Sequence, residues 1–207
     1  FQVNIAEALT LTVTDPEVWA SGGLTNTSGS NVESDFLRNK VTVSAKSNSP
    51  IGITVSMYTL DDTDLRNTAT YSILDSSSYI PTLASVATTG TNGSSFPVNY
   101  WGYSTDDTDT LNTSATYNAL RTSLNPIQLF TTVPVASSNV GDENTQDVFF
   151  GAKANNTKQS GTYTRTVYFA AVTGTIDTDN PLVPLTPSTP DPINNAAHYF
   201  CKLQVHG

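Results

Sequence analysis

The chain has 207 residues, a net charge of −9 and only 13% charged residues. Eighteen acidic against nine basic residues exclude nucleic acid and anionic membrane surfaces as favoured partners, because binding to phosphates needs clustered Lys and Arg. Nine Tyr, eight Phe and two Trp exclude a disordered chain, and a single cysteine, Cys201, excludes an internal disulfide framework.

The first fourteen residues alternate between apolar and polar side chains, and Glu7 is the only clear exception. A period of two predicts a half-buried β-strand, and at ~3.3 Å per residue this one would span roughly 46 Å, over twice the usual length. Such a strand must bend into a second sheet or pair with another subunit. We favour the second option, with Glu7 marking the crossover into the chain's own domain or pairing there with Lys or Arg. The predicted intersubunit residues are Phe1, Val3, Ile5, Leu9, Leu11 and Val13.

Short apolar or alternating runs continue to about residue 174, separated by segments rich in Gly, Pro, Asn and Asp. We expect the two runs 41–45 and 51–57 to form a hairpin, and the most β-prone run, 163–172, to be a central strand. This spacing predicts an all-β antiparallel sandwich over residues 15–174, of immunoglobulin-like or jelly-roll type, with extended terminal strands. The predicted strands after the first cover residues 40–46, 51–58, 68–73, 97–103, 127–133, 146–154 and 162–173.

Beyond residue 174 the composition changes. Pro181, Pro184, Pro187 and Pro190 recur at the period of a polyproline II helix, so residues 175–196 are predicted to form a semi-rigid spacer. Residues 197–207 alternate again and predict a short C-terminal strand. Both chain ends are therefore expected to be connectors. The start at Phe1, with neither an initiator Met nor a signal peptide, indicates a processed and exported product.

Segments 58–71 and 103–117 resemble each other, and each contains the sequence Asp-Asp-Thr-Asp. Closely spaced carboxylates in a loop suit Ca²⁺, although the Gly and the distal Glu of an EF-hand loop are missing. The alternative is a pair of solvated turns that Asp side chains stabilise through backbone amides. The candidate calcium ligands are Asp61, Asp62, Asp64, Asp106, Asp107 and Asp109.

No motif predicts an enzyme, and calcium is the only cofactor that the sequence suggests. There is no Gly-x-Ser-x-Gly, no His-Glu-x-x-His and no phosphate loop, and no run of 18 apolar residues predicts a membrane helix. A glycosidase that takes two carboxylates from distant strands is the enzymatic alternative. Trp19, Trp101 and Tyr103 either form an aromatic platform for carbohydrate or pack in the core.

Segments 39–57, 96–104 and 149–172 resemble a family of secreted bacterial envelope proteins, often adhesin-like or fibre-forming, from ultrasmall episymbiotic bacteria and some Gram-positives. The resemblance covers roughly residues 1–175, and the ending Cys-Lys-Leu-Gln-Val-His-Gly departs from it. It implies an exported β-sandwich at the cell surface without catalytic residues.

Together these features predict a structural subunit of an extracellular filament or pilus. The first strand would complete a neighbour's sheet, and the partner would be a second copy of the chain. The alternative is a monomeric surface adhesin, or a module that binds host or partner-cell glycans, on a Pro-rich stalk.

Overall fold

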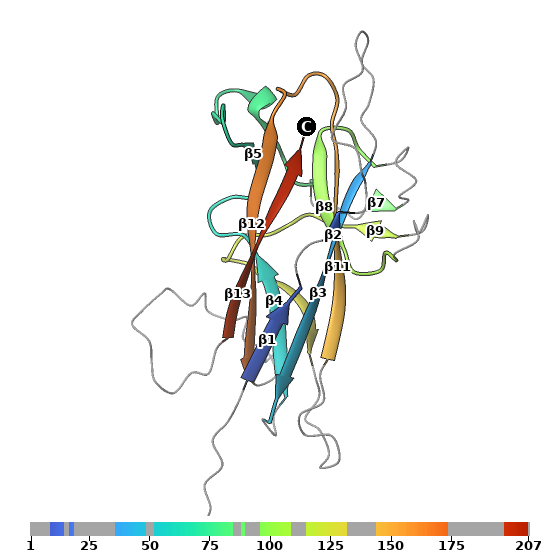
Figure 1. The fold of residues 1–207 in the computed structure, drawn as a ribbon, viewed down its shortest axis with the longest axis vertical. Helices are drawn as coiled ribbons and strands as arrows, with labels where there is room; N and C mark the ends of the chain where they lie inside the picture. The colour runs from blue at the N-terminus through green and yellow to red at the C-terminus, as the bar shows by residue number, and fades with distance from the viewer. Residues whose placement is uncertain are drawn as a thin grey trace, which may run out of the picture.

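The described residues of this computed structural model form two antiparallel sheets that pack face to face (Figure 1). Their only helical element is one turn of 3₁₀-helix, η1 (Ser76–Ser78). The predicted all-β sandwich is thereby confirmed. No helix in this part of the chain has the length and apolarity needed to cross a membrane. The residues described are 9–14, 17–18, 36–48, 52–84, 88–89, 96–108, 115–131, 144–173 and 197–206.

The first sheet is built around a long central strand, β3 (Leu37–Ser47), whose alternate residues Val41, Val43 and Ala45 are almost fully buried. These three side chains share one face because successive residues of a strand point to opposite sides. The sheet order is β1-β3-β11-β8, with β2 also paired to β3. The strands are β1 (Leu9–Val13), β2 (Glu17–Val18), β3 (Leu37–Ser47), β8 (Tyr100–Ser104) and β11 (Asn144–Lys153).

The second sheet is built around β12 (Thr162–Thr173), whose buried residues Val167, Phe169 and Ala171 alternate along the strand. β12 pairs with β13 along one edge and with β4 and β5 along the other, which confirms that segment 163–172 is a central strand. Strands β10 and β6 complete the sheet. The strands are β4 (Ile53–Tyr58), β5 (Leu65–Asn67), β6 (Tyr79–Ile80), β10 (Ile127–Thr131), β12 (Thr162–Thr173) and β13 (Ala197–His206).

A smaller third layer covers the outer face of β11. It contains the two-stranded sheet of β7 (Thr88–Thr89) and β9 (Thr116–Tyr117), and its core joins Phe96 and Tyr117 to Phe149. Gly151 makes this contact possible, because a Cβ atom there would lie 2.5 Å from the ring of Phe36 and 2.6 Å from that of Tyr117. The end of β11 is therefore buried on both faces.

Two predictions about local structure are wrong. Runs 41–45 and 51–57 form no hairpin, because β3 and β4 belong to different sheets and their apolar faces meet across the core. Gly52, just before β4, has a φ of 83°, a left-handed backbone conformation that favours glycine. Segment 68–73 is a turn and not a strand, and the pairing residues are those of β5 just before it.

Both ends of the described chain add strands to the sandwich. β1 pairs with β3 of the first sheet, and β13 pairs with β12 of the second, so the two strands lie side by side at one flank (Figure 1). The connection between β12 and β13, residues 174–196, lies outside the described residues.

Candidate functional site

Half of the predicted intersubunit strand belongs to the chain's own sheet. Leu11 is buried in the core, and Leu9 and Val13 are half-buried against it, all three in β1. β1 begins at Leu9, the first described residue, so the crossover predicted at Glu7 lies outside the described residues. Phe1, Val3 and Ile5 lie outside the described residues.

The register of β1 shows which of its residues pair with the backbone of β3. Leu9 is opposite Ser47, the last residue of β3, and Val13 is opposite Val43. Continued towards the N-terminus, the same register sets residue 3 opposite Ile53, which already starts β4 in the other sheet. The described pairing of β1 with β3 reaches only to Leu9, whereas the apolar alternation of the sequence continues to Phe1.

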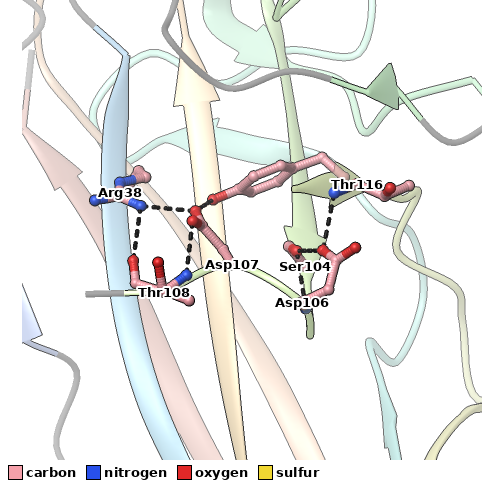
Figure 2. A network of polar contacts seen from close by, with 7 residues as sticks. Arg38, Ser104, Asp106, Asp107, Thr108 and Thr116 are labelled. Carbon is pink, nitrogen blue, oxygen red and sulfur yellow. Dashed lines mark hydrogen bonds and ion pairs between the residues drawn. The ribbon is translucent and has the colours of Figure 1, made fainter. Parts of the chain in front are cut away.

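The second Asp-Asp-Thr-Asp segment forms a buried network around Asp107 (Figure 2). Arg38, from β3, lies 2.7 Å from Asp107 Oδ2, and the hydroxyl of Tyr117 donates to the same oxygen at 2.7 Å. The backbone N–H of Thr108 donates to Oδ1. Burial, followed by the hydrogen bond to Asp107, raises the pKa of Tyr117, so this phenol stays protonated and remains a donor.

Asp106 faces away from this network (Figure 2). Its Oδ1 accepts from the hydroxyl of Ser104 at 2.6 Å and from the backbone N–H of Thr116 at 2.8 Å. The carboxylate thereby ties the end of β8 to the start of β9. Asp109 lies outside the described residues.

The first Asp-Asp-Thr-Asp segment repeats the arrangement at the corresponding aspartate. Asp62 occupies the position that Asp107 has in the second segment, and it too is held by arginine: Arg66 and, at 3.0 Å, Arg165 of β12. Tyr71, the counterpart of Tyr117, lies under the guanidinium of Arg66. Each segment therefore joins one aspartate to an arginine of a central strand. The two similar segments thus have the same structural role, which is to attach a loop to a central strand through an aspartate–arginine ion pair.

These contacts bear on the calcium prediction. Asp61 is exposed, Asp62 is neutralised by two guanidinium groups, and burial raises the pKa of Asp64. Among the described residues, no three His, Cys, Asp or Glu side chains gather as metal ligands would. The carboxylates that the structure describes act mainly as partners of arginine and of backbone amides.

Two of the three aromatic residues proposed as a platform, Trp101 and Tyr103, lie in the described β8. Trp101 is fully buried in the core and donates from Nε1 to the carbonyl of Thr63 at 2.7 Å, whereas Trp19 lies outside the described residues. Of the two described residues, Tyr103 is the half-exposed one, and it borders a pocket. Core packing, the second alternative, therefore holds for Trp101.

That pocket lies along the outer edge of β8 and has a volume of about 350 Å³. Two short segments bridge to β8 there, one through Thr82 and the other through Asn118. Its lining residues are Thr82, Leu83, Tyr103, Asn118, Ala119, Leu120 and Arg121.

Sequence reasoning missed the arginines. Arg38 is 69 residues from Asp107 and Arg165 is 103 residues from Asp62, so no local pattern connects them. The one available signal was the repeat itself, which carries Asp62 and Asp107 at equivalent positions.

Comparisons with known proteins find a likeness among solved structures. No family model and no curated protein matches the chain. Among solved structures, it is similar to AggA, the major subunit of aggregative adherence fimbriae type I (AAF/I) from Escherichia coli. The sequence identity is 13% and the TM-score 0.39, over 100% of this chain and 98% of that chain.

Proposed function

We propose that this chain is a structural subunit of an extracellular filament, in which residues 1–6 of each copy add a strand to a sheet edge of the next copy. The register of β1 carries the proposal. The chain's own β3 ends opposite Leu9, yet the apolar alternation continues through Ile5 and Val3 to Phe1. A strand that overruns its own sheet has backbone groups and apolar side chains left for another chain.

Strand addition suits such a segment. Main-chain hydrogen bonds supply the pairing, and alternate side chains enter pockets of the acceptor. The donating end and the accepting edge are different surfaces, so the contact does not close on itself and generates an open filament. The partner is a second copy of the same chain, at the cell surface.

The estimated free energies predict a weak contact between residues 1–6 and the accepting subunit. Burial of Phe1, Val3 and Ile5 contributes roughly 5–9 kcal/mol, at ~1.5–3 kcal/mol for each large apolar side chain. Ordering six residues costs about 6–12 kcal/mol, at ~1–2 kcal/mol each. Main-chain hydrogen bonds, at ~0.5–1.5 kcal/mol each, then decide the balance. We therefore expect assembly to depend on protein concentration.

Charge modulates the assembly. Subunits with a net charge of −9 repel each other, and salt screens this repulsion over a Debye length of ~8 Å at physiological ionic strength. Assembly is accordingly expected to improve when NaCl is raised from low to physiological concentration.

A matched pair of variants tests the proposal. Val3→Asp introduces a charge on the apolar side of the segment, whereas Asn4→Asp introduces the same charge on its polar side. Filaments, measured by sedimentation and negative-stain electron microscopy, should be lost in V3D and retained in N4D. The proposal expects both variants to melt at the wild-type temperature, because the described pairing of β1 with β3 begins at Leu9.

Two results would overturn the proposal. Wild-type protein that stays monomeric at high concentration and physiological salt would favour the monomeric adhesin. A large loss of thermal stability in V3D would show that residues 1–6 pack in their own domain.

A further inference from the structure

We propose that the pocket beside β8 binds a sugar residue that carries a carboxylate group. The inference is independent of filament assembly, since it rests on Tyr103, Asn118 and Arg121 and not on the N-terminal segment.

The pocket is built by three segments that hydrogen bonds hold together. Tyr103 and Asn118 exchange backbone hydrogen bonds of 3.0 and 2.7 Å, and Leu83 N–H donates to the carbonyl of Trp101 at 2.8 Å. The hydroxyl of Thr82 accepts from the backbone N–H of Leu120 at 2.8 Å, which links the two bridging segments. The walls are thus fixed before any ligand arrives.

The lining combines an apolar base with a few polar groups. Leu83 and Leu120 are each 3% exposed, while Tyr103 and Asn118 are half-buried and Arg121 is exposed. Binding sites for small molecules have this composition, and 350 Å³ is near the lower end of their usual ~300–1,000 Å³. The size fits one sugar ring better than a long oligosaccharide.

Arg121 determines the charge of the ligand. The chain has four arginines, and Arg38, Arg66 and Arg165 each bond to an aspartate. No carboxylate of the described residues forms an ion pair with Arg121, and the pocket lining contains no acid. Within the described part of the chain, the guanidinium group of Arg121 is therefore left for an anion from outside.

The anion that fits is a carboxylate. A guanidinium group binds a carboxylate through two parallel hydrogen bonds, and one arginine matches its single charge. A phosphate would bring more negative charge to a lining with no second cation. The net charge of −9 opposes any anion at long range, but salt screens that repulsion beyond ~8 Å.

The remaining groups suit a sugar ring. Tyr103 offers an aromatic face for the ring's C–H groups and a hydroxyl for its oxygens, and the Asn118 amide both donates and accepts. Burial raises the pKa of Tyr103, although the nearby charge of Arg121 lowers it, so the phenol remains a neutral donor at physiological pH.

The test compares three probes on the full chain by NMR titration: D-glucuronate, D-glucose and acetate. We expect glucuronate to bind with a millimolar dissociation constant and to shift the amide signals of residues 103 and 118–121. Glucose and acetate should each bind at least about tenfold more weakly, because each lacks half of the contacts.

Two substitutions test whether Arg121 binds the carboxylate group of glucuronate. Arg121→Gln should weaken glucuronate binding about tenfold or more, and Arg121→Lys should weaken it less, because the charge remains without the planar fork. Lys46→Gln, the same loss of charge at an exposed residue of β3, should leave binding unchanged. Arg121 is exposed, so its variants should keep the wild-type melting temperature.

Three outcomes would overturn the inference. If the wild-type protein does not bind glucuronate, the pocket is not the proposed binding site. Acetate binding as tight as glucuronate shows a simple anion site. If glucose and glucuronate bind equally well, and R121Q binds both as the wild type does, the carboxylate does not contribute to recognition.

Discussion

Asp107 shows how much a single carboxylate depends on its surroundings. Its side chain is fully buried, and Arg38 beside it is 8% exposed. A buried ion pair contributes little compared with well-packed apolar residues, yet losing one partner is expensive because the other charge remains buried. The pair therefore holds the loop after β8 against β3 without necessarily adding net stability.

A double-mutant cycle tests this account. Asp107→Asn should lower the free energy of unfolding by about 3–5 kcal/mol, and Arg38→Met by a similar amount. The double variant should lose less than the sum, with a coupling above ~1 kcal/mol. Urea denaturation measures both quantities.

The matched control is the pair Lys40 and Asp147, where the two charges are 3.8 Å apart and Asp147 is 43% exposed. Its coupling should lie between ~0 and 1 kcal/mol. Equal couplings in the two pairs would contradict the special role of the buried one.

Tyr117 predicts how stability changes at alkaline pH. Above pH ~10 the unfolded chain loses this phenolic proton while the folded chain keeps it, because burial and Asp107 raise its pKa. Unfolding then releases a proton, so stability is complete below pH ~10 and falls as the pH rises further. In Tyr117→Phe, the free energy of unfolding should fall less steeply with rising pH, by up to ~1.4 kcal/mol per pH unit. Identical slopes in urea titrations between pH 9 and 11 would refute this assignment.

At the scale of elements, the connection from β12 to β13 is unusually long. β13 pairs with β12 over ten residues, but the 23 residues 174–196 join them, where neighbouring antiparallel strands usually need 2–5. Five prolines in that connection favour an extended chain. The pairing of β13 within its own subunit is therefore worth a direct measurement.

Cys201 provides the probe. It is opposite Val167 in the β12–β13 register, and residues directly opposite each other have Cβ atoms ~4.5–5.5 Å apart, close enough for a disulfide after small adjustment. Val167→Cys should therefore form an intramolecular disulfide on oxidation, seen by non-reducing electrophoresis of dilute protein. The control Ala171→Cys lies about 13 Å further along the strand and should not. Disulfide-linked dimers from V167C would instead show that β13 pairs with another copy.

At the scale of the whole molecule, the sequence predicted strands better than their partners. The runs that became β3, β4, β11 and β12 were recognisable because burial of one face or both leaves an alternating or continuous apolar pattern. The pattern could not show that Val43 and Val55 enter one core from two different sheets and not from one sheet, since either arrangement buries both.

The candidate site was less predictable. The Asp-Asp-Thr-Asp segments were visible as repeats, but their arginine partners come from strands 69 and 103 residues away. The pocket at Tyr103 depends on two single bridges to β8, made by residues without a strand pattern. Both features arise from long-range packing, which local propensity does not encode.

The N-terminal segment is the feature on which the proposed function rests. If residues 1–6 serve only another copy, their removal should leave the sandwich intact, because β1 from Leu9 onwards supplies its own pairing and the buried side chain of Leu11. The truncated chain would also keep its accepting edge. It should then bind the end of a growing filament and stop it.

The most direct measurement is the length of filaments grown from wild-type protein in the presence of increasing fractions of the chain that lacks residues 1–6. The account predicts that the truncated chain alone is folded and monomeric, and that its addition shortens wild-type filaments in proportion to its fraction. Filaments of unchanged length, or filaments formed by the truncated chain itself, would contradict donation by the N-terminus.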